Sequence, residues 1–297
     1  MSLKFAIAKL FLATLLCGAV VVAAAPRPAS ADGFTDAFVG YRGGTSYREP
    51  TDPDAIAKTI LQFAYLHVNG LGTSFFNLDI LSSNGTDPAN NGKTANPCSC
   101  TGGAQELYAV FRHEFSLSGL TKHSFAFGPV RDVGINGGFN YNSKQDNFTA
   151  RVQQWMVGPE FSFKVPGSFN VSLMYRIEHN HSAFCLPDFS TGCGVQFKPT
   201  FYSESSWQFP FKVAVPAKFQ GFFTYNSAKG LDGSGSPTAP EILLESALMW
   251  DVGSLAGKKN SVYLGVGYQF WRNKYGSLPT VTGSQASPLQ LEAEFHL

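Results

Sequence analysis

Apolar and polar residues alternate with a period of two along most of the chain. The alternation is clearest at residues 287–297, where the two sets fall on opposite faces of an extended segment: Leu289, Leu291, Ala293, Phe295 and Leu297 against Gln290, Glu292, Glu294 and His296. Successive side chains of a strand point to opposite faces, so this pattern predicts a strand with one apolar and one polar face. Such a strand fits a soluble sheet packed on a core, or a barrel with lipid outside and water inside.

The same alternation predicts twelve strands. Their expected limits are 34–42, 57–68, 72–83, 104–115, 123–139, 147–164, 169–181, 198–211, 217–226, 241–252, 261–274 and 287–297. Long polar connections, such as 84–103, 182–196 and 227–240, follow odd-numbered strands, and short turns follow the others. An even strand count with both chain ends on the short-turn side is typical of outer-membrane barrels, whose short turns are periplasmic.

Residues 1–31 predict a secretory signal peptide. Lys4 and Lys9 precede an apolar run over 10–25, and the small residues Ala29-Ser30-Ala31 follow. An N-terminal membrane anchor is the alternative, but the run is short for a span and prolines follow it closely. A large residue before Cys17 argues against a lipoprotein. We therefore expect a signal peptide over 1–31 and one domain over 32–297.

Composition favours a transmembrane β-barrel for residues 32–297. This segment has 19 basic and 21 acidic residues, a net charge of −2, so it lacks the basic footprint of a nucleic-acid-binding protein. Charged residues make up only 14% of the chain, against about 25% in soluble domains, and phenylalanine occurs 27 times. No segment after the signal peptide has the roughly 18 apolar residues of a transmembrane helix. A closed barrel pairs all backbone groups within lipid without helices.

The prediction is therefore an all-β, antiparallel up-and-down barrel of about twelve strands. A secreted β-sandwich is the alternative, but it requires neither alternating loop lengths nor aromatic residues towards strand ends: Tyr175, Trp207, Phe209, Trp250 and Trp271. We expect a monomer in the bacterial outer membrane, in contact with outer-membrane lipid and lipopolysaccharide. The barrel assembly machinery would recognise its C-terminal strand.

Charged residues in the middle of strands should face the lumen, because a Lys or Arg on the lipid side costs about 2–4 kcal/mol. Strand parity assigns ten such residues: Asp36, Arg42, Asp79, Glu106, Arg112, Arg176, Glu178, Glu204, Glu245 and Glu292. Their signs are mixed, so they predict neither an anion funnel nor a cation funnel, and pairing that merely fills the barrel is an alternative role. Uncharged groups that would suit a neutral, hydroxyl-rich, partly aromatic solute are Asn77, Tyr108, Gln153, Tyr202, Gln208 and Thr224.

Adjacent Arg131 and Asp132 interrupt the alternation, and the pattern assigns neither to a face. A β-bulge near Gly128-Pro129, or a position beyond the hydrocarbon, would explain them.

Four cysteines, Cys98, Cys100, Cys185 and Cys193, occur in two long loops on the expected outer side. Export to an oxidising compartment predicts disulfides. Three pairings are possible, and bonds between the two loops are favoured because Cys98 and Cys100 would close a very tight ring. No zinc-ligand spacing is present, and His179 and His181 are interpreted as solvated, so we expect neither a metal nor a cofactor.

An outer-membrane lipid hydrolase is the enzymatic alternative. It would need a Ser–His pair and an orienting third group on the lipid-facing wall. His113, Ser205 and Ser246 occupy apolar faces of their strands, but nothing in the sequence brings them together, and there is no G-x-S-x-G motif. The sequence therefore predicts a protein that is not an enzyme.

A set of short segments stands out along the chain: FVGYRG at 38–43 with Glu49-Pro50, SFFNLD at 74–79, Asp87-Pro88, GAQELY at 103–108, FRH at 111–113, FGPVRDVG at 127–134, VGP at 157–159 and VPG at 165–167. Together they resemble the nucleoside-specific channel-forming (Tsx-like) family of outer-membrane proteins. The match covers most of the chain after the signal peptide and is dense in its first half. Two features depart from the family pattern, since Leu297 replaces a terminal aromatic residue and the loops carry cysteines.

The resemblance implies a monomeric twelve-stranded barrel that passes nucleosides by facilitated diffusion. It also implies that lumen aromatics contact the base and that polar side chains bind the sugar. With the lumen charges, it gives a set of candidate ligand-binding residues: Arg42, Phe75, Asn77, Asp79, Glu106, Tyr108, Arg112, Arg131, Asp132, Arg176, Glu178 and Glu204. A general small-solute porin and a purely structural barrel are the alternatives.

Overall fold

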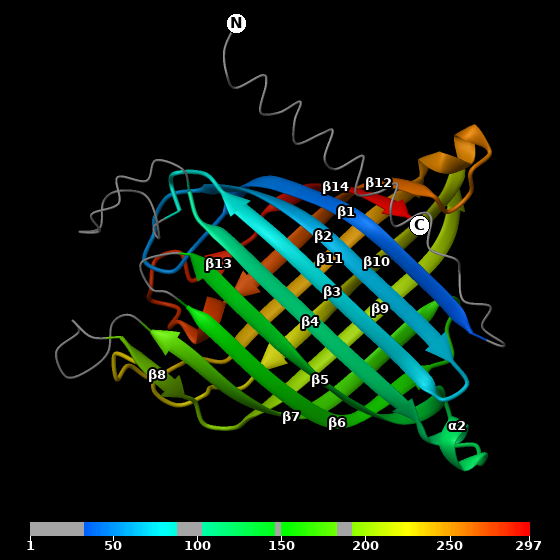
Figure 1. Cartoon of the computed structure of the whole chain (residues 1–297), viewed down its shortest axis with the longest axis horizontal. Helices are drawn as coiled ribbons and strands as arrows, with labels where there is room; N and C mark the ends of the chain where they lie inside the picture. The colour runs from blue at the N-terminus through cyan, green and yellow to red at the C-terminus, as the bar shows by residue number, and fades with distance from the viewer. Residues whose placement is uncertain (1–32, 88–102, 146–149, 183–191) are drawn as a thin grey trace, which may run out of the picture.

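The chain folds into antiparallel strands that wind around one axis (Figure 1). The computed structural model describes residues 33–87, 103–145, 150–182 and 192–297. The strands are β1 (Phe34–Tyr47), β2 (Ile56–Asn69), β3 (Gly72–Ser83), β4 (Gln105–Ser116), β5 (Val130–Gln145), β6 (Arg151–Phe163), β7 (Ser168–Ser182), β8 (Cys193–Gln196), β9 (Thr200–Val213), β10 (Val215–Asn226), β11 (Glu241–Asp251), β12 (Val262–Arg272), β13 (Gln285–Ala286) and β14 (Leu289–His296).

Twelve of these strands close into a barrel, which confirms the predicted fold class. Each long strand pairs with the next along the chain, and β14 pairs with β1, so that Arg42 lies opposite Glu292. The short strands β8 and β13 only extend the edges of β7 and β12. At the closing seam the backbone N–H of Leu297 donates to the carbonyl of Ala37, at 2.8 Å. His296 Nδ1 lies 2.7 Å from a carboxylate oxygen of Asp36.

The two ends of the barrel carry different connections. The first described residues, the C-terminus, the short helix α2 (Leu117–Thr121) and the 3-10 turn η1 (Val252–Ala256) lie at one end (Figure 1). The connections 48–55, 227–240 and 273–288 lie at the other end, with the 3-10 turn η2 (Lys274–Gly276) in the last of them. Among the described residues, no helix is long and apolar enough to cross a membrane.

The predicted start of the fifth strand at His123 is wrong. Ser116 caps α2 by accepting a hydrogen bond from the backbone N–H of Gly119, at 2.9 Å, and Lys122 ends the helix in the left-handed conformation. The connection therefore occupies residues 117–129, and β5 begins only at Val130. A hydroxyl N-cap satisfies an amide that the first helical turn leaves free, which favours this turn over a longer strand.

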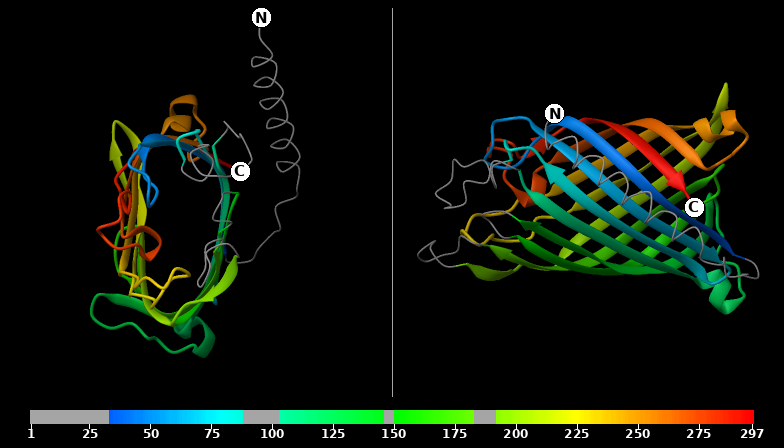
Figure 2. Two further views of the ribbon diagram at one scale, coloured as in Figure 1. Left: turned by 90° about the vertical axis from the view of Figure 1, so that its left-hand side faces the viewer. Right: turned by 45° about the horizontal axis from the view of Figure 1, so that its top comes forward.

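The barrel wall is apolar outside and polar inside. Large outward side chains are exposed, with Trp155 at 56% and Leu291 at 70%, whereas inward charged residues such as Arg42 and Asp79 are buried. Viewed along its axis, the ring of strands is taller than it is wide (Figure 2). A water-soluble protein has the opposite distribution of polarity, so this wall is suited to a lipid environment.

Candidate functional site

The lumen is the candidate site, because strand parity brings charged and aromatic side chains from most of the wall into it. All ten charges that parity assigned inward lie on the lumen side of their strands: Asp36, Arg42, Asp79, Glu106, Arg112, Arg176, Glu178, Glu204, Glu245 and Glu292. Gln153 was assigned wrongly, since it is exposed on the outer wall and its neighbour Gln154 points inward. Trp271 also faces inward, where its indole N–H donates to Glu241 at 2.7 Å.

One polar network surrounds Arg42. Its guanidinium contacts Asp79 on β3 and Glu245 on β11, each at 2.5 Å. Because β11 is three places away from β1 around the barrel, this side chain spans part of the lumen rather than only its neighbours. Asn77 donates to Asp79 at 3.0 Å, and Gln269 donates to Glu245.

A second network surrounds Arg112. This residue pairs with Glu204 at 2.9 Å, although β4 and β9 are four places apart around the barrel. Asn140 accepts a further hydrogen bond from Arg112 at 2.8 Å, and the hydroxyl of Tyr202 donates to Glu204 at 3.0 Å. Arg176 lies over the Tyr202 ring, 5.0 Å from its centroid, and this contact extends the network to β7.

Glu178, which also faces the lumen, is shared between two cations. Arg176 approaches it at 2.7 Å and Lys229, from the β10–β11 connection, at 2.5 Å. Ion pairs that are buried this deeply are stable only where the geometry is good and several N–H donors of the cations are hydrogen-bonded at once.

The two networks meet at β3 and β4. There Phe75 is the cross-strand partner of Arg112, and Asp79 is the partner of Tyr108. The Nε atoms of Arg42, Arg112 and Arg176 are buried and have no hydrogen-bond partner within the described part of the chain. The centre of the lumen thus combines two aromatic rings with three guanidinium groups that each have a donor to spare.

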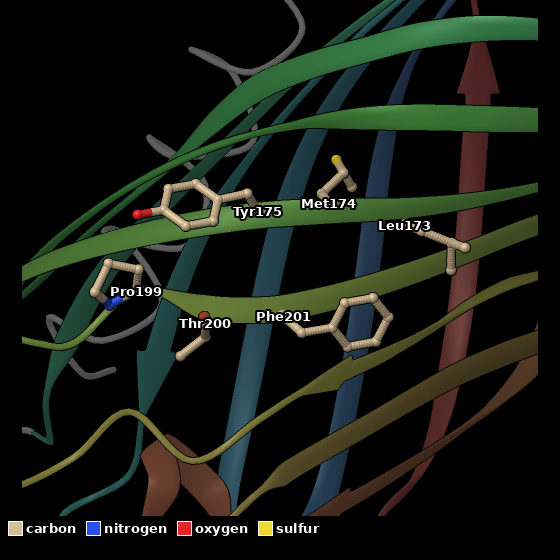
Figure 3. A pocket seen from close by; sticks show the side chains of 6 residues that line it. All are labelled: Leu173, Met174, Tyr175, Pro199, Thr200 and Phe201. Atoms are coloured by element: carbon tan, nitrogen blue, oxygen red, sulfur yellow. The ribbon is translucent and has the colours of Figure 1, made fainter.

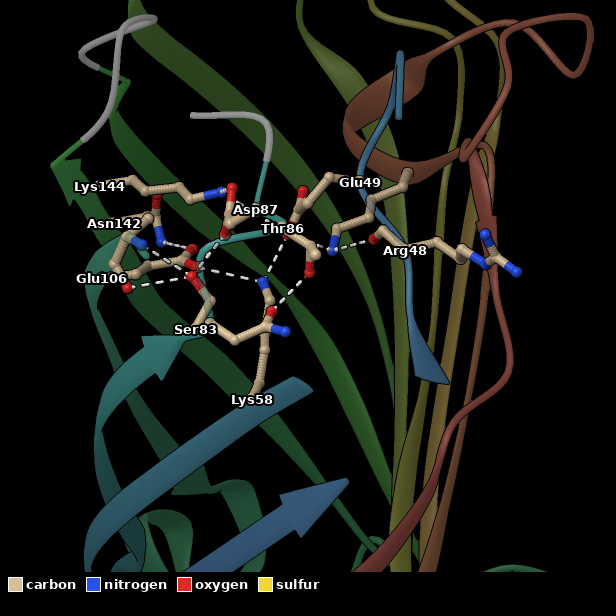
Figure 4. Close-up of polar contacts among 12 residues, drawn as sticks. Arg48, Glu49, Lys58, Ser83, Thr86, Asp87, Glu106, Asn142 and Lys144 are labelled. Carbon is tan, nitrogen blue, oxygen red and sulfur yellow. Dashed lines mark hydrogen bonds and ion pairs between the residues drawn. The ribbon is translucent and has the colours of Figure 1, made fainter. Parts of the chain in front are cut away.

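A third cluster lies at the end of the barrel that carries the long connections (Figure 4). Glu49, from the β1–β2 connection, reaches into the barrel and contacts three ammonium groups. Lys274 approaches at 3.1 Å and Lys144 at 3.7 Å, and Lys58 also pairs with Glu49. We call these four residues the Glu49 cluster. Each side chain is at most 8% exposed, so the connection between β1 and β2 is docked against the lumen.

Two further carboxylates balance the charge of the Glu49 cluster. Asp87 pairs with Lys144 at 3.0 Å, and Glu106 lies 3.9 Å from Lys58. Asn142 donates to the other oxygen of Glu106 at 2.5 Å. Three carboxylates therefore face three ammonium groups. Of the predicted site residues, Glu106 alone belongs to this region.

Burial and charge act in opposite directions on the titration of this cluster. Burial would raise the pKa of Glu49, but Lys274, Lys58 and Lys144 outweigh it and hold that pKa well below its ordinary value. Burial lowers the pKa of Lys274 to about 8, despite the attraction of Glu49. The three lysines were not predictable from the sequence, because no local pattern shows that a loop carboxylate will meet them.

Arg131 and Asp132 lie away from the central lumen. The register shifts between Val130 and Asp132, so a bulge is present at Arg131, close to the expected position. Arg131 is exposed. The Asp132 carboxylate accepts hydrogen bonds from Ser116 and Ser118, each at 2.5 Å, and it thereby holds α2 against the barrel.

The outer wall contains a Ser–His pair that the sequence did not reveal. Ser74 Oγ lies 2.8 Å from His113 Nδ1, and the two residues are cross-strand partners. Among the described residues, no group hydrogen-bonds the other ring nitrogen of His113. A hydrolytic triad requires a third group that orients the imidazole, so this pair lacks part of the arrangement that a lipid hydrolase needs.

A shallow groove of about 360 Å³ also lies on the wall between β7 and β9 (Figure 3). Its outward lining is apolar and aromatic: Leu173, Tyr175, Pro199 and Phe201. Such a surface suits lipid contact rather than the recognition of a polar solute.

Comparisons with known proteins extend to architecture only. No protein-family model matches the sequence, and a comparison with curated proteins also finds no match. The chain is similar to a structure of the KdgM porin, with 9% identity, a TM-score of 0.40, and coverage of 87% of this chain and 98% of that chain. For the NanC porin the values are 8%, 0.44, 87% and 100%.

A third similar structure is the translocator domain of the autotransporter NalP from Neisseria meningitidis. Its identity is 10% and its TM-score is 0.42, with 98% of this chain and 97% of that chain covered. Likenesses at this level carry no inference about solute or activity, and the Tsx-like resemblance is not confirmed by them.

Two sequence predictions fall mainly outside the described residues. The signal peptide over 1–31 lies wholly outside them. Of the four cysteines, only Cys193 is described, at the start of β8. Cleavage and disulfide bonding therefore stay predictions.

Proposed function

We propose that the protein is an outer-membrane channel through which small uncharged solutes, and nucleosides in particular, diffuse. The observation that carries this proposal is a wall with exposed apolar residues outside and dense polar networks inside. Burial of apolar surface in lipid stabilises such a barrel by about 25 cal/mol per Å², whereas exposure to water on all sides would not. On this proposal the protein is a monomer that contacts lipid and lipopolysaccharide, and the barrel assembly machinery inserts it through its C-terminal strand.

The pairing of lumen charges supports an uncharged solute. Each central arginine is matched by at least one carboxylate: Arg42 by Asp79 and Glu245, Arg112 by Glu204, and Arg176 by Glu178. An anionic solute would have to displace these partners. A neutral solute with hydroxyl groups could instead pass without breaking these ion pairs, and its hydroxyls could still donate to the carboxylates.

The aromatic residues support a nucleoside within that class. Phe75 and Tyr108 flank the Arg112 and Asp79 positions on β3 and β4, so a flat base could stack while its sugar contacts charged groups. Base stacking on an aromatic side chain contributes about 1–3 kcal/mol. A channel must also release its solute, so millimolar affinity, about −4 kcal/mol, is sufficient.

Liposome swelling with the purified protein tests the proposal. A nucleoside should enter faster than a disaccharide and faster than an uncharged sugar derivative of similar size. Arg112→Ala or Glu106→Ala should reduce this preference more than it reduces ion conductance. Leu107→Ala, on the outer face of the same strand, is the matched control and should leave the preference unchanged.

A general pore is the competing function. Entry rates that depend on solute size alone, and that neither lumen replacement alters, would establish the general pore and refute nucleoside selectivity.

A further inference from the structure

Two carboxylates lie together on the lumen side near the end of the barrel that carries α2. Glu114 on β4 and Glu160 on β6 are each 8% exposed, and only β5 separates their strands. Neither forms an ion pair within the described ranges. Two arginines in this region are otherwise placed, since Arg112 pairs with Glu204 and Arg131 is exposed.

A glycine lets the two carboxylates approach each other. Gly134 on β5 is the cross-strand partner of Glu160. A Cβ atom at Gly134 would lie only 2.1 Å from Oε1 of Glu114. The Glu114 carboxylate therefore lies over the backbone of Gly134, directly beside the strand position of Glu160.

Asn136 on β5 has a buried polar atom beside these two carboxylates. The residue is 4% exposed, and its Oδ1 atom is buried without a hydrogen-bond partner. The amide cannot be turned round, because its NH₂ group donates to Glu160 at 2.6 Å and to Ser172 at 3.1 Å. Oδ1 is therefore directed to the opposite side, towards β4, where Glu114 is the cross-strand partner of Asn136.

We propose that Glu114, Glu160 and Asn136 bind a hard cation, with Ca²⁺ as the species that fits best. Carboxylate and amide oxygens are the ligands that Ca²⁺ prefers, and water from the lumen would complete its six to eight positions. Glu160 Oε2 already accepts from Asn136 and Ser172, which leaves Oε1 for the cation. It is costly to bury an amide oxygen that accepts no hydrogen bond, and costly to bury a carboxylate that has no ion pair. One bound cation would satisfy the amide oxygen and both carboxylates.

The site would act independently of the transported solute. A cation there would place positive charge on the lumen wall near the α2 end, so Ca²⁺ added on the α2 side should reduce K⁺ conductance. All the proposed ligands are carboxylate or amide oxygens, so a site of this composition should discriminate against transition metals, which prefer nitrogen or sulfur ligands.

Calcium titration of the purified, folded barrel by isothermal calorimetry is the direct experiment. The wild type should bind one Ca²⁺, and both Glu114→Gln and Glu160→Gln should weaken binding by about tenfold or more, because each removes one ligand charge. Gly134→Ala should also weaken binding, since the added methyl group displaces the Glu114 carboxylate. Gly137→Ala, on the outer face of the same strand, meets only ordinary contacts of 3.6 Å and is its matched control.

The second readout is side-dependent block of K⁺ conductance by Ca²⁺ in planar bilayers. Block from the α2 side that disappears in Glu114→Gln, while circular dichroism and unblocked conductance stay at wild-type values, would support the site. A wild-type protein that binds no Ca²⁺, or equal binding in wild type and Glu114→Gln, would overturn it. Nucleoside selectivity can fail in swelling assays without changing either result.

Discussion

Replacement of Glu49 by Gln should undock the connection between β1 and β2. The substitution removes one of three carboxylates that balance three ammonium groups, and it keeps the side-chain size. The side chains of Lys58, Lys144 and Lys274 are only 4%, 8% and 2% exposed, so the remaining positive charge is poorly hydrated in the docked state. Removal of one partner from a buried ion pair costs about 3–5 kcal/mol.

A cost of about 3–5 kcal/mol is enough to shift the equilibrium between the docked and undocked positions of this connection. Each 1.4 kcal/mol changes an equilibrium tenfold, so the docked population should fall relative to the undocked one by roughly a hundredfold or more. Two measurements report it. Single-channel conductance should rise as the loop leaves the lumen, and trypsin should cleave faster after Arg48.

A double variant tests whether charge balance is the cause. Glu49→Gln combined with Lys274→Met removes one charge of each sign, and methionine can still pack against Trp271, whose ring now lies 4.4 Å from the Lys274 ammonium. The double variant should recover most of the wild-type conductance and protease resistance. Glu49→Gln protein with wild-type conductance and cleavage rate would refute the reasoning. A double variant that departs further from the wild type than Glu49→Gln in conductance and cleavage rate would also refute it.

Three other predictions concern titration, membrane contact and topology. The pKa of Lys274 is lowered from 10.5 to about 8, so between these pH values the folded protein loses a proton that the unfolded chain retains. The free energy of unfolding should therefore rise with pH across that window. Guanidinium titrations at several pH values should show this rise in the wild type and not in Lys274→Met. Leu291→Arg should destabilise the barrel in phospholipid vesicles by about 2–4 kcal/mol, whereas Leu255→Arg in η1 should have little effect. Equal effects of the two substitutions would argue against a lipid-facing β14. An epitope tag within 227–240 should bind antibody on intact cells; binding only after lysis would reverse the proposed orientation.

Strand positions were largely predictable from the sequence, because a wall with lipid on one side and polar groups on the other imposes period-two alternation. The expected 72–83 strand matches β3, and inward parity was correct for charges as far apart as Asp36 and Glu292. The assignment of residues to the inner or outer face was wrong where the alternation was weak. Gln153 and Gln154 are both polar, so the pattern gave no reason to choose between them.

Long-range contacts in the lumen were not predictable. Arg112 meets Glu204 across four strand positions, and Glu49 meets Lys274 from a separate connection, and neither pairing follows from local spacing. The helix α2 was missed for a related reason. Its cap and its anchor, Ser116 and Asp132, lie on different strands, so the sequence around 117–129 shows only part of what stabilises it.

The closing seam has a consequence for how the chain reaches its folded state. The contact between His296 and Asp36 joins residues 260 positions apart, so β14 can pair with β1 only after all the strands between them have been made. Contacts of such high order slow folding, because the whole chain must be ordered before the ends meet. Until then both edge strands expose unpaired backbone groups, which favour aggregation. On the proposed outer-membrane location, a chain with this topology depends on being kept apart from other unfolded chains during export. Removal of His296 and Leu297 should lengthen that interval.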